Sequence, residues 1–371
     1  MATTMTVQEA PSLEETLRLM RARLRGIVPD WEIELKADLA FEINGLKAER
    51  NAIILGHNYM EPALYHTVTD YVGDSLELSR RAADTEAEII VFCGVRFMAE
   101  TAKILSPDKT VLLPSMQAGC SLAESITADD VRELKRLFPG VPVVTYVNTY
   151  VDIKAESDAC CTSSNAAAVI ESFDTDTVIF LPDEYLARNV ARETGRRIIF
   201  PSAPTGEKPT SRRLQPARSS DEGEPTIVGW PGRCEVHEQF TVDDVRNIRK
   251  QFPEVVVLAH PECAPEVVDE CDFSGSTTAM IRYVHDSQAP RYLLLTECSM
   301  GDNIMAENPE KDMLRMCSVR CPHMNEITLE HTLAALQHTQ YVIEIDPDLA
   351  ARARRALDRM LEIKPSATAC T

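Results

Sequence analysis

The sequence predicts an α/β protein in which βαβ units form parallel sheets. Short apolar runs alternate with segments of helical periodicity along most of the chain, and this alternation is typical of parallel sheets. The runs are rich in β-branched residues with few polar interruptions, as expected for strands that helices cover on both faces. Related motifs recur along the chain, which indicates repeated units. The predicted strands are residues 52–56, 89–92, 110–113, 141–147, 177–181, 198–200, 255–259 and 292–296.

The composition excludes several classes of protein. The chain has 371 residues, of which 44% are hydrophobic and 26% charged, as in ordinary globular proteins of two or three domains. No apolar run approaches the roughly 20 residues of a membrane helix, and we recognise no secretory signal. The formal net charge of −20 argues against nucleic acid, which it would repel. Small anions are still compatible with this charge, because backbone amides at helix N-termini can hold them.

We expect a cytoplasmic location. The chain has 11 cysteines, an odd number without the spacing of a small disulfide scaffold. In a cytoplasmic chain this pattern favours free thiols and metal ligands over disulfides.

The N-terminal part precedes the first predicted strand. We expect residues 1–12 to be disordered, and helical periodicity predicts helices over 13–26 and 33–49. Residues 1–34 are assigned to an N-terminal extension, so that the first α/β repeat begins at residue 35.

A duplicated motif marks the start of two further repeats. The pattern Thr-x-Asp-Asp-Val-Arg, followed by Phe-Pro, begins at Thr127 and again at Thr241. Each copy has the capping-box spacing that opens a helix. Cys120 and Cys234 precede the two copies at the same offset of 114 residues (241 − 127 and 234 − 120). The predicted α/β repeats are therefore residues 35–126, 127–240 and 241–345.

Each repeat then follows the same plan. His57, Asn148 and His260 follow the first strand of the three repeats. A turn of small residues opens a helix 15 to 18 residues later, at 73–75, 162–164 and 275–277. A cysteine follows 63, 86 and 61 residues after the strand end (57 to 120, 148 to 234 and 260 to 321).

The second repeat is longer because it contains the low-complexity segment 205–225, which we interpret as an inserted surface loop. Apart from this insertion, the three repeats are nearly equal in length. We expect three homologous α/β domains around a pseudo-threefold axis with a central cluster site. The C-terminal helix predicted at 346–363 is expected to pack back on the first repeat.

Three of the cysteines, Cys120, Cys234 and Cys321, lie in equivalent loops of this plan. Three thiolates that converge on the threefold axis could hold a [4Fe–4S] cluster with one open iron, which acts as a Lewis acid. A zinc site would normally require a fourth protein ligand, and buried cysteines can also be small hydrophobic residues. The other cysteines have no counterpart in the repeats, Cys317 included, and are interpreted as structural.

Polar residues at the predicted carboxyl ends of strands are candidates for acid–base chemistry, because ligands of open α/β sheets bind there. A structural hydrogen-bonding role is the alternative for each histidine. The hydroxyls of the three small-residue turns suit carboxylates or phosphate, although ordinary N-capping would also use them. The acid–base candidates are His57, Tyr59, Tyr146, His237, His260 and Glu262, the anion-binding candidates are Ser75, Ser163, Ser276 and Thr277, and Asn148 is a substrate-binding candidate.

Several stretches together resemble the quinolinate synthases. The matches follow the family order over residues 35–360, and a run as long as 94–107 is highly specific. The Cys317 position and the 205–225 insertion are departures from the family pattern. The matching stretches are Gly-His-Asn-Tyr at 56–59, Gly-Asp-Ser-Leu-Glu at 73–77, residues 94–107, Gln-Ala-Gly-Cys-Ser-Leu at 117–122, Tyr-Val-Asn at 146–148, Thr-Ser-Ser at 162–164, Cys-Glu-Val-His at 234–237, His-Pro-Glu at 260–262, Gly-Ser-Thr at 275–277 and Cys-Pro-x-Met at 321–324.

The resemblance implies one [4Fe–4S] cluster held by Cys120, Cys234 and Cys321. It implies a transferase of NAD biosynthesis that condenses iminoaspartate with dihydroxyacetone phosphate to quinolinate, phosphate and two waters. The enzyme that supplies iminoaspartate is an expected partner, while nucleic acid and membrane are not. Tyr59 and Glu262 are implied in proton transfer. The other implied roles are substrate orientation or protonation by His57, Tyr146, Asn148, His237 and His260, and the holding of carboxylates and phosphate by Ser75, Ser163, Ser276 and Thr277.

Two alternatives are kept. The first is another open-iron hydro-lyase acting on a different polyacid. A simple dehydration needs fewer catalytic and binding groups, so Tyr59 and the third anion site distinguish the two functions. The second is a non-enzymatic iron–sulfur redox sensor or electron carrier. Such a protein would need a fully ligated cluster, with Cys317 or His323 as the fourth ligand.

Overall fold

The computed structural model describes residues 6–201, 224–316 and 319–364. The chain forms two compact units. The first comprises Met1–Gly119, Arg246–Leu258 and Thr277–Glu344, and the second comprises Cys120–Val245, Ala259–Ser276 and Ile345–Thr371. No helix within the described ranges is long and apolar enough to cross a membrane.

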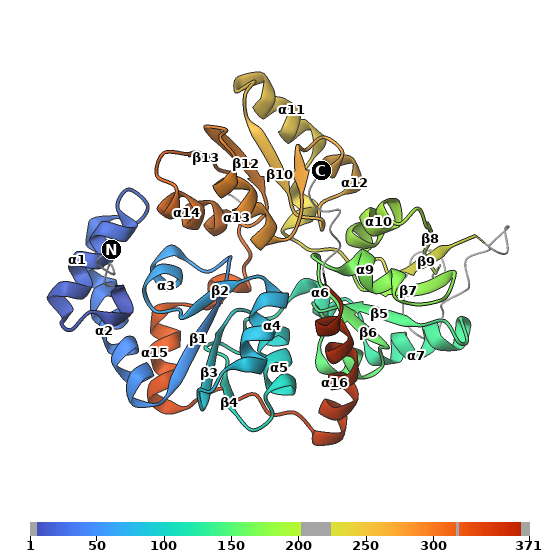
Figure 1. The fold of residues 1–371 in the computed structure, drawn as a ribbon, viewed down its shortest axis with the longest axis horizontal. Helices are drawn as coiled ribbons and strands as arrows, with labels where there is room; N and C mark the ends of the chain where they lie inside the picture. The colour runs from blue at the N-terminus through green and yellow to red at the C-terminus, as the bar shows by residue number, and fades with distance from the viewer. Residues whose placement is uncertain (1–5, 202–223, 317–318, 365–371) are drawn as a thin grey trace. The chain divides into compact units, whose positions relative to one another are not determined.

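The first sheet is parallel and has the strand order β2-β1-β3-β4. Helices α2 and α15 pack on each other and contact β1 and β3, while α4 and α5 form a second pair against β1 and β4 (Figure 1). The strands are β1 (Ala52–His57), β2 (Tyr71–Gly73), β3 (Ile89–Cys93) and β4 (Thr110–Leu112), and the helices of this part are α1 (Leu13–Leu24), α2 (Asp30–Glu49), α3 (Pro62–Thr67), α4 (Ser75–Asp84), α5 (Arg96–Leu105) and α15 (Leu329–His338).

The second sheet is also parallel and has the order β6-β5-β7-β9-β8. Its core includes Val143, Ile179, Val228 and Trp230, which are at most 2% exposed. The strands are β5 (Val143–Tyr146), β6 (Ala159–Cys161), β7 (Thr177–Leu181), β8 (Arg197–Ile199) and β9 (Thr226–Gly229), and the helices are α6 (Ser121–Glu124), α7 (Ala128–Leu137), α8 (Val151–Ala155), α9 (Ala166–Glu171), α10 (Glu184–Glu193), the 3₁₀ turn η2 (His237–Gln239) and α16 (Pro347–Glu362).

The third sheet has the order β11-β10-β12-β13, the same as that of the first sheet. Its strands are β10 (Val256–Ala259), β11 (Phe273–Ser274), β12 (Arg291–Leu295) and β13 (Asp312–Leu314). The helices that accompany it are α11 (Val242–Gln251), α12 (Pro265–Val268), α13 (Thr277–Asp286), α14 (Cys298–Glu307) and the 3₁₀ turn η3 (Met324–Glu326).

The predicted fold class is confirmed, because the eight predicted strands are present and belong to three parallel sheets, of which the first and the third share one strand order. In the second sheet β9 takes the place of β4 and β13, and β8 is an additional strand at the edge. Most of the predicted 205–225 loop lies outside the described residues, between β8 and β9. The domain boundaries and the threefold axis stay predictions. Sequence patterns missed β2, β6, β9, β11 and β13, which have only two to four residues each.

The predicted capping boxes open α7 and α11. Thr127 Oγ1 accepts a hydrogen bond from the amide of Asp130 at 3.3 Å, and Asp130 Oδ2 accepts one from the amide of Thr127 at 2.9 Å. Thr241 and Asp244 make the same reciprocal pair at 3.3 and 2.8 Å. The duplicated motif therefore marks equivalent helices, each leading into the first strand of a sheet.

Two expectations about the ends of the chain differ from the structure. Helix α16 packs against α8 and β6 of the second sheet, not on the first repeat. Its buried face includes Ala353 and Leu357, and the side-chain Nδ2 of Asn165 donates to the carbonyl oxygen of Met360 at 3.2 Å. Within the expected disordered lead, residues Val7–Glu9 form the 3₁₀ turn η1 because Val7 is buried, at 6% exposure.

Candidate active site

The three repeat cysteines share one backbone geometry. The carbonyl oxygens of Cys120, Cys234 and Cys321 each accept a hydrogen bond from the amide four residues later, at 3.0, 3.0 and 3.1 Å. Each cysteine thus begins a helical turn, and it does so after β4, β9 or β13 of its sheet. The equivalence predicted from spacing therefore extends to the local fold of these loops.

The Cys234 loop is tied tightly to the second sheet. The Gly232 amide donates to the carbonyl oxygen of Pro182 at 3.1 Å, and the Glu184 amide donates to that of Gly232 at 2.7 Å. A Cβ atom at Gly232 would lie 2.5 Å from the Pro182 oxygen, so the close approach requires glycine. The Glu235 amide donates to Ser121 Oγ at 3.3 Å, which joins the Cys234 loop to the loop that follows Cys120.

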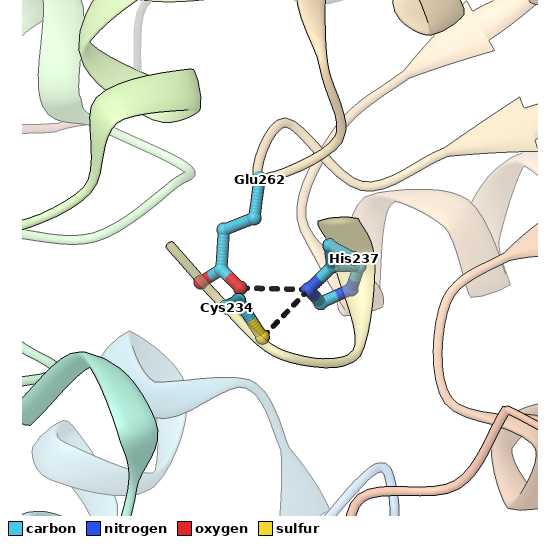
Figure 2. Close-up of side chains that lie close together, drawn as sticks. All are labelled: Cys234, His237 and Glu262. Carbon is cyan, nitrogen blue, oxygen red and sulfur yellow. Dashed lines mark hydrogen bonds and ion pairs between the residues drawn. The ribbon is translucent and has the colours of Figure 1, made fainter. Parts of the chain in front are cut away.

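Cys234, His237 and Glu262 form a compact cluster in the second unit (Figure 2). His237 Nδ1 lies 2.7 Å from Glu262 Oε2 and 3.2 Å from Cys234 Sγ. Both His237 and Glu262 are almost fully buried, at 2% and 3% exposure. The His237 ring also stacks on that of His260, with centroids 4.7 Å apart and an interplanar angle of 24°. An acid–base pair therefore lies directly beside a thiol.

Glu262 is held as a carboxylate. Burial on its own would raise its pKa, but the neighbouring His237 and His260 and a hydrogen bond from Tyr146 lower the pKa to about 2. Asn148 Nδ2 lies 3.4 Å from the other carboxylate oxygen, Oε1. Glu262 is thus a buried anion that its neighbouring donors keep ionised.

The pKa of the Cys234 thiol is shifted upward, in the opposite direction from the pKa of Glu262. Burial raises its pKa well above the usual value, and the nearby Glu262 and Cys120 raise it further. A thiolate at this position therefore requires a cationic partner, which a metal centre supplies.

His57 and His260 occupy matching turns. His57 Nδ1 accepts a hydrogen bond from the Tyr59 amide at 3.2 Å, and His260 Nδ1 accepts one from the Glu262 amide at 3.3 Å. An Nδ1 that accepts leaves the proton of a neutral ring on Nε2. In the second unit, His260 Nε2 lies 3.3 Å from Ser163 Oγ, which can accept that proton's hydrogen bond.

The first unit holds a second group of predicted site residues. The Tyr59 hydroxyl lies 2.5 Å from Thr296 Oγ1, and both residues are buried. Asn58 Nδ2 donates to Thr277 Oγ1 at 2.9 Å, which sets the orientation of that hydroxyl. The His57 and Tyr59 rings meet edge to face, with centroids 4.5 Å apart.

The predicted site residues therefore fall into two sets, one in each unit. Ser163 lies in the turn before α9, which begins at Ala166 with Asn165 as its N-cap residue, and not at the helix N-terminus itself. Ser75 is the first residue of α4. The first unit carries His57, Tyr59, Ser75, Thr277 and Cys321, and the second carries Cys120, Tyr146, Asn148, Ser163, Cys234, His237, His260, Glu262 and Ser276.

Sequence reasoning missed Thr296 and assigned no role to Asn58. Thr296 ends a predicted strand, and Asn58 lies between two predicted site residues. Both positions could have been recognised from the sequence, because ligands bind at the carboxyl ends of parallel strands. Their partners, Tyr59 and Thr277, are 237 and 219 residues away along the chain. Pairs so distant in sequence are not visible in a local pattern.

Parallel sheets with buried acid–base groups beside a thiol, beyond the strand ends, define an α/β enzyme. Comparison with known proteins gives the family. The model of the "Quinolinate synthetase A protein" family matches residues 41–362. "Quinolinate synthase 2" of Mesorhizobium japonicum is 48% identical over 352 residues, which are 95% of this chain and 99% of that protein.

Two further relatives agree. "Quinolinate synthase 1" of the same organism is 50% identical over 339 residues (91% of this chain, 95% of that protein), and "Quinolinate synthase" of Agrobacterium fabrum is 49% identical over 341 residues (92% and 90%). The chain belongs to the quinolinate synthase family and is an enzyme of NAD biosynthesis. Family membership implies a [4Fe–4S] cluster. The redox-sensor alternative is thereby set aside.

Proposed function

We propose that this chain condenses iminoaspartate with dihydroxyacetone phosphate to quinolinate, phosphate and two waters. The observation that carries the proposal is the buried cluster of Cys234, His237 and Glu262, in which an ionised carboxylate and an imidazole lie beside a thiol. Condensation and double dehydration require several proton transfers next to a centre that polarises the substrate.

We further propose that Cys120, Cys234 and Cys321 hold the [4Fe–4S] cluster. The donor set fits, because three thiols in loops of one backbone geometry suit a cluster that three thiolates ligate. When bound, the cluster supplies a Lewis acid at its open iron, which polarises a substrate oxygen or nitrogen.

The residues of the second unit then handle protons and one acidic group. Glu262 and His237, which are in contact at 2.7 Å, act as one acid–base pair, so that a proton taken from substrate carbon is shared between the imidazole and the carboxylate. Tyr146 and Asn148 fix the carboxylate by hydrogen bonds. His260 Nε2 and Ser163 Oγ, 3.3 Å apart, offer two adjacent donors for a substrate carboxylate.

The residues of the first unit act on the second substrate in this proposal. Tyr59 transfers a proton during isomerisation or dehydration, with Thr296 as its hydrogen-bond partner, and His57 orients a substrate oxygen. The hydroxyls of Ser75 and Thr277 hold carboxylate and phosphate groups at turns after strands, and Ser276 of the second unit has the same role there. Local dipoles of this kind let a chain with a net charge of −20 take anionic substrates.

The source of the imine and the location of the enzyme complete the proposal. Iminoaspartate hydrolyses readily, so an enzyme that supplies it is the expected partner. We assign the reaction to the cytoplasm, because thiol ligands of a cluster need a reducing compartment. Among the described residues, nine cysteines are thiols.

The proposal is tested by purification without oxygen, followed by iron and sulfide analysis and an assay with both substrates. We expect about four iron and four sulfide ions per chain and the formation of quinolinate. A single zinc ion without acid-labile sulfide would contradict the cluster. A loaded cluster without quinolinate formation, together with dehydration of another polyacid, would favour the hydro-lyase alternative.

Replacing Tyr59 by phenylalanine is expected to leave the cluster intact and to lower kcat about 10²-fold, because a general acid–base group contributes at least that much. Steady-state kinetics and iron content of the purified variant check both parts. Tyr341→Phe is the matched control, since Tyr341 is 46% exposed and should keep its kcat. Near-normal turnover of Tyr59→Phe would remove Tyr59 from the mechanism.

A further inference from the structure

We propose that Lys154 is a positioning residue for the reaction, which holds the turn that carries Tyr146 and Asn148 against Glu262. The inference rests on the proposed function and adds to it a residue outside the sets proposed for proton transfer, substrate binding and cluster ligation. Lys154 lies in α8, and its side chain is fully buried, at 0% exposure. Burial of an ammonium group in the core of a protein is strongly unfavourable unless polar partners compensate it.

Two partners of Lys154 are the backbone carbonyls on either side of Asn148. Its Nζ donates to the carbonyl oxygen of Val147 at 2.9 Å and to that of Thr149. Neither carbonyl belongs to β5, which ends at Tyr146. This segment lies beyond the end of β5, where a neighbouring strand no longer supplies regular hydrogen bonds. The charged Lys154 ammonium group supplies hydrogen bonds to both oxygens instead.

The turn itself is closed by further short contacts. The Thr149 amide donates to the Val147 carbonyl oxygen at 2.8 Å, so that Asn148 is the centre of a three-residue turn. Thr149 Oγ1 donates to the Tyr146 carbonyl oxygen at 3.2 Å. Lys154 therefore donates hydrogen bonds to Val147 and Thr149, the two residues that flank Asn148, and their backbone positions set the direction of the Asn148 side chain.

Asn148 and Tyr146 connect this turn with the reaction. Asn148 Nδ2 lies 3.4 Å from Glu262 Oε1, and Tyr146 donates to the same carboxylate. A displacement of the turn therefore changes the position of the proposed proton acceptor. Displacements near 1 Å can lower turnover about 10²-fold, even when the altered residue does not touch the substrate.

A purely structural role is the competing interpretation, and Lys47 offers a matched comparison. Lys47 is also buried, at 7% exposure, and donates to a backbone carbonyl, that of Val68, at 2.8 Å. Its second partner is Asp70, also at 2.8 Å. None of these residues belongs to the proposed machinery, so loss of the Lys47 ammonium should affect stability alone.

The first experiment compares Lys154→Met with Lys47→Met in the full-length, cluster-loaded protein. We expect Lys154→Met to keep its iron and sulfide content and to lose about 10²-fold in kcat. Lys47→Met should lower the melting temperature and keep kcat within about twofold. An unchanged kcat in Lys154→Met, in a preparation whose wild type makes quinolinate, would overturn the inference but leave the proposed function standing.

The second experiment is a double-mutant cycle between Lys154→Met and Asn148→Ala. If Lys154 acts through Asn148, its replacement in the Asn148→Ala background should lower kcat by less than about threefold, because coupled residues are non-additive. Losses that multiply would indicate independent effects and contradict the positioning role. Should Lys154→Met not fold, Lys154→Arg keeps the charge and serves in the same cycle, with the same two outcomes.

Discussion

Replacing Cys321 by alanine is expected to leave the protein without its [4Fe–4S] cluster and without measurable quinolinate formation. Under the proposed ligand assignment only three thiolates hold the cluster, and the loss of one leaves two irons without protein ligands. Iron and sulfide analysis after anaerobic reconstitution, together with the visible absorption of the cluster, measures the first effect. The condensation assay measures the second. Circular dichroism checks that the variant is folded.

The control for this prediction is the neighbouring Cys317→Ala. Cys317 has no counterpart in the other two repeats, so this variant should keep its cluster. Cys263→Ala is a second control, because Cys263 is a fully buried cysteine outside the repeat positions. A cluster that survives in Cys321→Ala but is lost in Cys317→Ala would move the third ligand to Cys317. It would leave the assignments of Cys120 and Cys234 in place.

Replacing Glu262 by glutamine is expected to lower kcat about 10³-fold while the cluster is retained. The substitution keeps the shape of the side chain but removes the buried negative charge that His237 and His260 stabilise. It also places amide N–H groups where donors from His237 and Asn148 point. Loss of a general base lowers turnover about 10²- to 10⁴-fold. Steady-state kinetics with both substrates gives the size of the effect.

Glu156→Gln is the matched control for Glu262→Gln. Glu156 is a partly buried glutamate that pairs with Arg132 and Arg352 in the second unit. Its neutralisation removes ion pairs without touching a predicted site residue, so kcat should stay within about twofold. If Glu262→Gln kept nearly normal turnover, the substrate proton would have to go to another acceptor, and His237 would be the first candidate.

Much of the fold was predictable because it depends on local patterns. The β-branched strands, the capping boxes at Thr127 and Thr241 and the spacing of the repeats all arise within short segments. Short edge strands such as β6 and β11 escaped, since two or three residues carry too little periodicity to be recognised. Strand β8 was predicted as a strand, but its position in the sheet was not. Nothing in its sequence reveals that β9 lies between it and β7.

The sequence by itself determined the α/β class, the repeated units, the equivalent loops of Cys120, Cys234 and Cys321, and the family. These follow from residue types at fixed spacings, which backbone geometry converts into local structure. The tertiary structure decided which groups meet: His237 with Glu262, Tyr59 with Thr296, and Lys154 with the Asn148 turn. It also decided that α16 packs on α8. Such contacts depend on how whole elements pack against one another, and packing selects among many surfaces of similar polarity that a linear pattern cannot rank.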